Sequence, residues 1–233
     1  MKIAVFGDSY SASSYMNPSP TWVDLLAEKH DVQNFSLSGS SLYFSVSLLL
    51  KHGWNFEKNI LVVTQPGRIM IPDEHYVPEL HQRAIAGIRT IDHLEKNLTE
   101  NNNFLQRYYN AAKEYFMYLQ DDKYDSYIHN VMVRDAIKKV LNLIVIPAFP
   151  NSDVPGITTS MHHIYIKECE GWGETEHTAK EYRDIRNCHM TAENNAIFAE
   201  KVEQWISGSP VYINVDDFVS NPDNKSDYLE KLL

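Results

Sequence analysis

Three residues carry the side chains that nucleophilic catalysis by serine needs: Ser9, His189 and Asp184. A serine hydroxyl is a weak nucleophile until a base removes its proton, and the imidazole of histidine is the commonest base. A carboxylate beside the imidazole fixes its tautomer and stabilises the imidazolium that forms. These residue types predict attack by Ser9 on an acyl carbon, with His189 as the base and Asp184 as the residue that orients it.

Such a reaction also needs hydrogen-bond donors for the oxyanion of its tetrahedral intermediate. The backbone N–H groups of Ser9 and Gly39 are the natural pair, because a residue without a Cβ lets the backbone come close to a ligand. Gln65 could add a side-chain amide N–H, and Arg68 could bind an anionic or carbonyl oxygen. We interpret Asp8 as a hydrogen-bond acceptor within its turn rather than as a catalytic acid.

Short apolar runs alternate with longer amphipathic ones, and the candidate residues lie where these runs begin or end. We predict strands at 2–6, 32–35, 59–64, 141–147 and 210–215. We predict helices at 19–29, 45–51, 80–118, 126–141 and 191–207. Apolar strands that alternate with helices predict an α/β protein with a mainly parallel sheet covered on both faces. Because ligands of such sheets bind outside the carboxyl ends of the strands, we expect the candidate residues to meet at that edge.

Three sequence blocks occur in a recognisable order at these positions. Gly7-Asp8-Ser9 follows the first predicted strand, Gly39 follows the second, and His189 stands just before the last helix. In this order and placement, the chain resembles the SGNH (or GDSL) hydrolase superfamily and looks like a divergent, phage-type member. The resemblance implies a flavodoxin-like three-layer α/β/α sandwich and hydrolysis of O-acyl esters without a metal or organic cofactor.

Two blocks depart from the pattern of that family. Its third block is Gly-x-Asn-Asp, whose Asn helps to bind the oxyanion, whereas here the third strand runs into Thr-Gln-Pro-Gly-Arg at 64–68. Its last block has Asp three residues before the histidine, and Arg186 holds that position here. Asp184, five residues before His189, is therefore the candidate for orienting the imidazole. The alternative is a backbone carbonyl, which would leave a Ser-His dyad.

Length and composition set the broader expectations. A chain of 233 residues favours one domain, since single cores stop growing near ~250–300 residues. We expect a single domain over 1–233, with a helical insertion at about 80–140. Cys169 and Cys188 do not make a disulfide framework. The first apolar run is too short for a signal peptide and no run is long enough to span a membrane. We therefore expect a cytoplasmic protein, although a virion component would look the same.

The net charge of the chain indicates which classes of binding partner are unfavourable. Lys and Arg number 21 against 31 Asp and Glu, which gives a net charge of −10. A strongly acidic chain argues against electrostatic binding to nucleic acid or to an anionic membrane. The expected partner is a small-molecule or carbohydrate ester. We prefer acetyl groups on carbohydrate because the strand-end loops are polar and no long apolar stretch suits a fatty chain. The sequence gives no prediction of the oligomeric state.

A polar cluster in the second half of the chain contains the residue types of a metal site. It contains potential ligands at His162, His163, Glu168, Cys169, Glu170, Glu174, Glu176 and His177. Their spacing matches no His-Glu-x-x-His or Cys-x-x-Cys pattern, so we predict a solvated loop and no metal. Because this loop precedes His189, it could still wall the substrate cleft.

Other functions are compatible with the same residues. An acyltransferase would use the same site and pass the acyl group to a sugar rather than to water. A non-catalytic binding or structural protein could retain the fold, and the missing Gly-x-Asn-Asp block favours it. A flavodoxin-like module could use residues 9–14 as a phosphate loop, but this interpretation leaves His189 unexplained.

Overall fold

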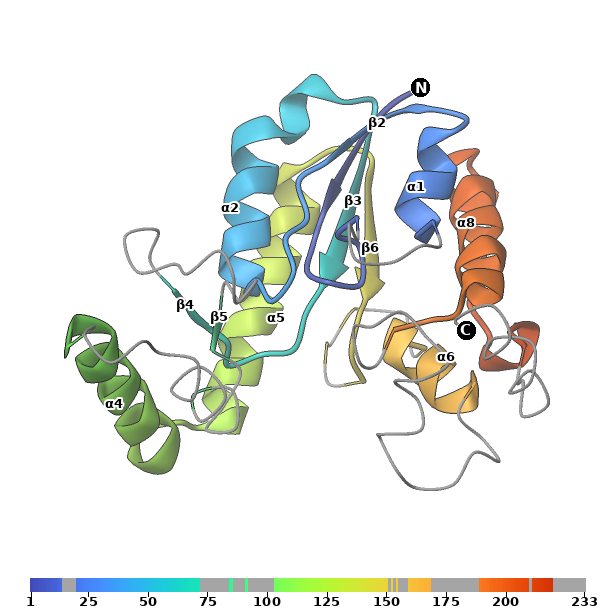
Figure 1. Cartoon of the computed structure of the whole chain (residues 1–233). Coiled ribbons are helices and arrows are strands. Elements are labelled where there is room, and N and C mark those ends of the chain that lie inside the picture. The colour runs from blue at the N-terminus through green and yellow to red at the C-terminus, as the bar shows by residue number, and fades with distance from the viewer. Residues whose placement is uncertain are drawn as a thin grey trace.

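A parallel β-sheet forms the centre of the molecule. The structure, a computed structural model, describes residues 1–13, 20–71, 84–85, 91, 103–150, 152, 154, 159–168, 189–209 and 211–219. In these residues the sheet contains β1 (Lys2–Phe6), β2 (Asp31–Asn34), β3 (Lys58–Val63) and β6 (Leu143–Pro147). Their order is β2-β1-β3-β6 and every pairing is parallel (Figure 1). The predicted α/β class with a mainly parallel sheet is confirmed.

The central strands are buried on both faces, as their apolar sequences predict. Successive side chains of β3 alternate between two cores, with Ile60 and Val62 in one and Leu61 and Val63 in the other. Val5 of β1 lies opposite Ile60 and belongs to the same core. The strands therefore need helices on both faces to cover them.

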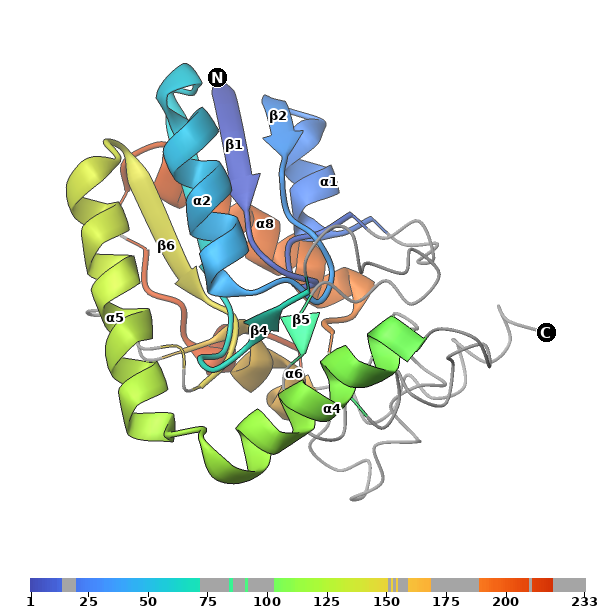
Figure 2. The same cartoon turned by 90° about the vertical axis from the view of Figure 1, so that its left-hand side faces the viewer.

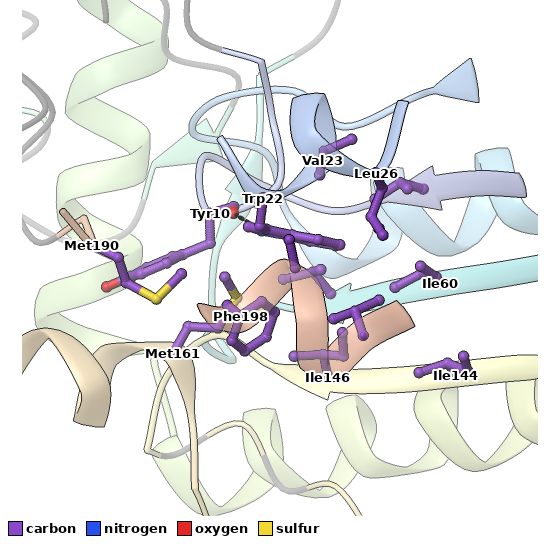
Figure 3. Close-up of a cluster of buried hydrophobic side chains, with 14 of the residues drawn as sticks. Tyr10, Trp22, Val23, Leu26, Ile60, Ile144, Ile146, Met161, Met190 and Phe198 are labelled. Atoms are coloured by element: carbon purple, nitrogen blue, oxygen red, sulfur yellow. Dashed lines mark hydrogen bonds between the residues drawn. The ribbon is translucent and has the colours of Figure 1, made fainter. Parts of the chain in front are cut away.

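The helices α1 (Trp22–Ala27) and α8 (Ala192–Ile206) cover one face of the sheet (Figures 1 and 2). The rings of Trp22 and Phe198 meet edge to face with centroids 5.4 Å apart, and both are fully buried. Figure 3 shows this core, in which the two rings lie over the side chain of Ile146 and its neighbours on the sheet.

Local signals explain where these two helices begin and end. Thr21 and Asp24 form a capping box, in which each side chain accepts a hydrogen bond from the other residue's backbone N–H. The side chain of Thr191 accepts a hydrogen bond from the backbone of Asn194 at the start of α8. Gly208 follows the end of α8 with φ +88°, a conformation that favours glycine and is common just after the end of a helix.

The helices α2 (Leu42–His52) and α5 (Asp122–Lys139) cover the opposite face. Leu49 of α2 and Val133 of α5 are fully buried in the second core, which also contains Leu61 and Val63 of β3. A short 3-10 helix, η1 (Gly53–Asn55), leads from α2 into β3. The described core thus has helices on both faces of the sheet, which agrees with a three-layer arrangement.

A smaller unit lies beyond the carboxyl ends of the central strands. It pairs β4 (Ile69–Met70) with β5 (Ala84–Ile85) in antiparallel fashion, beside α4 (Asn103–Tyr118) (Figure 2). Ile85 and Tyr109 are buried together in a third apolar cluster. The helical prediction over 80–118 is therefore wrong at Ala84–Ile85, where backbone pairing with β4 overrides the local pattern.

Two further predictions are corrected in the last third of the chain. The predicted loop around His162 and His163 contains a helix, α6 (Met161–Glu168), whose Ile164 is fully buried. The strand predicted at 210–215 is not formed in the part that the structure describes, where 211–214 is irregular and η4 (Val215–Asp217) is a 3-10 turn. The turn forms because the Asn214 side chain accepts a hydrogen bond from the Asp216 backbone, which ends the extended run.

Length and apolar composition decide whether a helix can span a membrane. The longest described ones are α5 with 18 residues and α4 with 16, and both carry charged residues along their length. No helix in the described ranges is both long enough and apolar enough to cross a membrane.

Candidate functional site

The turn after β1 presents Ser9 at the carboxyl edge of the sheet. The carbonyl oxygen of Asp8 accepts hydrogen bonds from the backbone N–H groups of Ser11 (3.1 Å) and Ala12 (2.9 Å). Ser9 follows Asp8 within this turn and is half-buried. A Cβ at Gly7 would lie 2.2 Å from the Ser11 hydroxyl oxygen and 2.7 Å from a side-chain carbon of β3. Gly7 is therefore required by close packing under the candidate nucleophile.

Asp8 joins the ends of β1 and β3. Its fully buried carboxylate accepts a hydrogen bond from the Tyr10 backbone N–H at Oδ1 (3.1 Å) and from the Thr64 hydroxyl at Oδ2 (2.6 Å). Nη1 of Arg68 lies 3.5 Å from Oδ2. The interpretation of Asp8 as a hydrogen-bond acceptor in the turn is confirmed, and its contacts extend to the third strand end.

The loop after β2 is tied to the same place. Gly39 has φ +68°, a left-handed conformation that favours glycine and turns the chain there. The carbonyl of Gly7 accepts hydrogen bonds from the Leu37 N–H and the Ser40 hydroxyl, both at 3.0 Å. Nη1 of Arg68 donates to the carbonyl of Ser40 at 3.0 Å. The strand ends that carry Ser9, Gly39 and Arg68 are thus brought together, as predicted from their positions.

The side chain of Arg68 is only 9% exposed, and its guanidinium carbon lies 5.2 Å from the ring centroid of Phe149. Burial lowers the pKa of Arg68, and the charge of Asp8 opposes this effect. Nη1 is occupied by the Ser40 carbonyl, whereas the buried Nε has no hydrogen-bond partner in the described part of the chain. Arg68 therefore cross-links the strand ends, and its role in binding a substrate oxygen stays a prediction.

His189 reaches the same edge from the other end of the chain. It is 8% exposed and lies two residues before Thr191, which caps α8. The ring of Tyr10 stacks on the imidazole, with centroids 4.7 Å apart and an angle of 25° between the planes. The residue after Ser9 is therefore in direct contact with the candidate base.

The stacked Tyr10 is held from two further sides. Its hydroxyl lies 3.0 Å from Nδ1 of His162 on α6. Its carbonyl accepts a hydrogen bond from the indole N–H of Trp22 at 2.7 Å, which Figure 3 shows as a dashed line. Asn195 of α8 accepts from the Trp22 backbone N–H at 3.0 Å and donates to the Met190 carbonyl at 3.1 Å. The turn after β1 and the segment leading into α8 are therefore fixed relative to each other.

Sequence reasoning missed Tyr10 and His162. Tyr10 directly follows the Gly-Asp-Ser block, but no sequence signal indicates that its ring covers His189. The sequence predicts a solvated loop at His162, whereas this residue is half-buried and contacts Tyr10. Burial lowers the pKa of His162, and the neighbouring His163 lowers it further. An imidazole beside the stacked pair is thus biased towards its neutral form.

The other candidate residues differ in whether the structure describes them. Gln65 lines a cavity together with Arg68, and its role as an oxyanion donor stays a prediction. Asp184 lies outside the described residues, so its role in orienting His189 also stays a prediction. Cys169 and Cys188 lie outside them as well. Within the ranges that the structure describes, there is no cluster of three side chains able to hold a metal ion.

A scan against models of protein families finds none that matches the chain, and a search of curated proteins finds no match.

Proposed function

We propose that the protein is a serine esterase of the SGNH type, which hydrolyses O-acyl esters with acetyl groups on carbohydrate as its preferred class. The contact between Tyr10 and His189 carries the proposal, because it brings the residue after Ser9 against the candidate base. This contact lies at the carboxyl edge of a parallel sheet, where ligands of α/β proteins bind. Helices on both faces of that sheet agree with the architecture that the resemblance implies.

In the proposed reaction, Ser9 Oγ attacks the acyl carbon while His189 accepts the hydroxyl proton. The tetrahedral intermediate collapses, its bond to the alcohol oxygen breaks, and His189 returns the proton to the departing alcohol. Water then attacks the acyl-serine with His189 again as base, which releases the carboxylic acid and restores Ser9. The backbone N–H groups of Ser9 and Gly39 serve as oxyanion donors in both steps.

The immediate surroundings of Ser9 favour a small acyl group. The turn is closed by Ser11 beneath it and by Ser40 and Thr64 from the neighbouring strand ends, all of them buried. Their hydroxyls donate within the protein, to the carbonyls of Asp8 and Gly7 and to the Asp8 carboxylate, and they surround the turn with small polar side chains rather than an apolar channel for a long chain. Acetyl is the smallest acyl group that natural esters commonly carry, and it makes the least demand on apolar surface.

Hydrolysis of p-nitrophenyl acetate by the wild type and by Ser9→Ala tests the proposal. We expect Ser9→Ala to lower kcat/KM by about 10³-fold or more, since loss of a serine nucleophile removes the covalent route. Ser13→Ala is the matched control, because Ser13 is exposed on the same segment and donates to Asp24. Its kcat/KM should stay within about twofold of the wild type, as expected for a residue outside the site. Equal rates for Ser9→Ala and the wild type would refute the assignment of Ser9.

The same assay separates hydrolysis from acyl transfer. Glucose is added at increasing concentration, and the acetylated sugar and free acetate are both measured. Acetate as the main product in the presence of sugar supports an esterase. Acetylated sugar as the main product identifies an acyltransferase that uses the same Ser9 and His189.

Two observations favour a non-catalytic binding protein as a second candidate. The Nη1 atom of Arg68 is occupied by the Ser40 carbonyl, and no Asn follows β3 as it does in the family. If neither Gln65 nor Nε of Arg68 acts as a donor, the oxyanion site has only backbone N–H groups. A binding protein of this kind would leave p-nitrophenyl acetate unhydrolysed in the wild type as well as in Ser9→Ala.

A further inference from the structure

The helix α5 carries apolar side chains on two faces. Val133 and Ala136 face inward and are buried in the second core. On the outer side, four apolar residues recur at intervals of three and four positions and stay between 38% and 64% exposed: Tyr124, Tyr127, Ile128 and Val131. We call these four residues the outer stripe. A helix that is apolar on both faces is ordinarily covered on both, so the outer stripe indicates a binding surface.

Exposed apolar residues of neighbouring elements extend the outer stripe. Tyr118 is the last residue of α4, and it and Leu119 lie shortly before α5, both exposed. Tyr43 of α2 is exposed as well and lines the same cavity as Tyr124. Figure 2 shows α5 at the periphery of the molecule, where a partner can reach it. Exposed apolar patches that are rich in tyrosine are typical of protein–protein interfaces.

The charges of α5 favour a second copy of the chain as that partner. The helix has three acidic and four basic residues, whereas the whole chain has a net charge of −10. Two copies that meet at α5 therefore meet at a nearly neutral element of a strongly acidic chain, where their mutual repulsion is small. A nucleic acid or an anionic membrane would be repelled by the rest of the chain.

The outer stripe is complementary to itself when the second copy lies antiparallel. Successive residues of a helix are about 100° apart, so Arg134 continues the face of Tyr127 two turns further along. In an antiparallel pair that crosses near residue 130, the guanidinium of Arg134 reaches the ring of Tyr124 in the other copy. A cation over an aromatic face is attractive. A parallel pair would instead place Arg134 against Arg134, with like charges opposed.

A pair of opposite charges flanks the outer stripe on one side. Asp121 caps the start of α5 and Lys139 is its last residue, and the ~18 residues between them make five turns, which places both on the same side of the helix. In the antiparallel crossing, Asp121 of each copy faces Lys139 of the other, and two-fold symmetry makes this contact twice. Lys139 also pairs with Asp135 of its own helix at 2.8 Å, but its exposed ammonium has donors for a second carboxylate.

We propose that two copies of this chain associate through the outer stripe of α5, packed antiparallel about a two-fold axis near Asn130. Val131 then packs against Tyr127 of the other copy, and Tyr124 packs against Arg134. This homodimer goes beyond the proposed esterase function and does not depend on it. One helix of 18 residues is about 27 Å long, and a contact of this size is at the small end of stable interfaces, so we expect a Kd on the order of 10–100 µM.

Sedimentation equilibrium of the full chain measures this association. We expect the mass to rise from that of one chain towards that of two as the protein concentration passes through the Kd. Val131→Asp should raise the Kd at least about 10-fold, because it places two carboxylates beside the axis. Ile137→Asp is the matched control, since Ile137 is 44% exposed against 45% for Val131 but lies about 120° away around the same helix. Its Kd should stay within about threefold of the wild type.

Cysteine cross-linking tests the antiparallel orientation. Cys169 and Cys188 are first replaced by serine, and one new cysteine is then introduced. Val131→Cys places the two thiols of a dimer next to the axis, so mild oxidation should link them. Tyr124→Cys is on the same stripe but six residues from the axis, which separates its two copies by about 18 Å, beyond the ~7 Å that a disulfide allows between Cα atoms. It should stay unlinked under the same conditions.

Three results would overturn the inference: a wild type that stays monomeric at about tenfold above the expected Kd, equal effects of Val131→Asp and Ile137→Asp, or linking of Tyr124→Cys as fast as Val131→Cys. The cross-linking keeps the test decisive if Val131→Asp does not fold. None of these measurements involves an ester, so a dimer without esterase activity would refute only the proposed function. Esterase activity of a monomer would refute only this inference.

Discussion

Replacing Asp8 by alanine removes the side chain that joins the first and third strand ends. The variant loses the hydrogen bonds from the Tyr10 backbone N–H (3.1 Å) and the Thr64 hydroxyl (2.6 Å). It also leaves the buried Arg68 without the carboxylate 3.5 Å away, so that the Ser40 carbonyl is the remaining acceptor for Nη1. We expect the loss of a buried, hydrogen-bonded anion to destabilise the whole edge.

The magnitude follows from these contacts. Removing one partner of a buried ion pair costs about 3–5 kcal/mol, because the other charge stays buried and uncompensated. For a chain of this size, 1 kcal/mol corresponds to about 2–4 °C in Tm, so Asp8→Ala should lower Tm by about 6–20 °C. Arg68→Met should also destabilise, since it leaves the Asp8 charge buried. The double variant should cost less than the sum of the two by about 1–3 kcal/mol, because neither charge is left alone.

Urea unfolding followed by circular dichroism gives the free energy of unfolding for all four proteins. The coupling free energy is the difference between the double variant's loss and the sum of the single losses. A loss below about 1 kcal/mol for Asp8→Ala would refute the reasoning, since surface substitutions reach nearly that size. Additivity within about 0.5 kcal/mol would also refute it, because residues in one network should couple.

Two further predictions concern the residues around this edge. Gly7→Ala should lower the free energy of unfolding by about 1–3 kcal/mol, because the new Cβ would lie 2.2 Å from the Ser11 hydroxyl oxygen. Calorimetry measures the Tm of this variant, and an unchanged Tm would contradict the prediction. The pKa of His162 is lowered by burial, so its contribution to stability is complete above the unfolded pKa of about 6.5 and is lost as the pH falls towards the lowered folded value. His162→Gln should therefore flatten the fall in Tm between about pH 8 and pH 5, and an unchanged slope would exclude His162 as its source.

Much of the fold could be predicted because its signals are local. The first strand, Lys2–Phe6, has the predicted bounds, since an unbroken apolar run ends at a glycine. The last helix begins at a Thr cap and ends before Gly208, both of which are short-range features. The prediction of a strand at 210–215 was wrong because this apolar run has no strand to pair with in the described sheet. Pairing is a property of the whole sheet and cannot be read from six residues.

The sequence could predict which strand ends meet at the candidate site but not the contacts between their side chains. Ser9 and Gly39 were placed at one edge because parallel strands bring their carboxyl ends together. The stacking of Tyr10 on His189 depends on α8 and α6, and His162 reaches it only because its polar segment is helical. Arg68 cross-links the strand ends only because the loops after β1, β2 and β3 are close together in space. Sequence spacing does not predict the positions of loops relative to one another.

Covalent labelling of Ser9 with a fluorophosphonate is the most direct test of the proposed active site. The reagent reacts with serines whose hydroxyl is activated by a base, and peptide mapping by mass spectrometry locates the adduct. We predict one adduct, on the peptide that contains Ser9, which is absent in Ser9→Ala and forms much more slowly in His189→Gln. Failure of the folded wild type to react, or an adduct on a different residue, would contradict the assignment of Ser9 as an activated nucleophile.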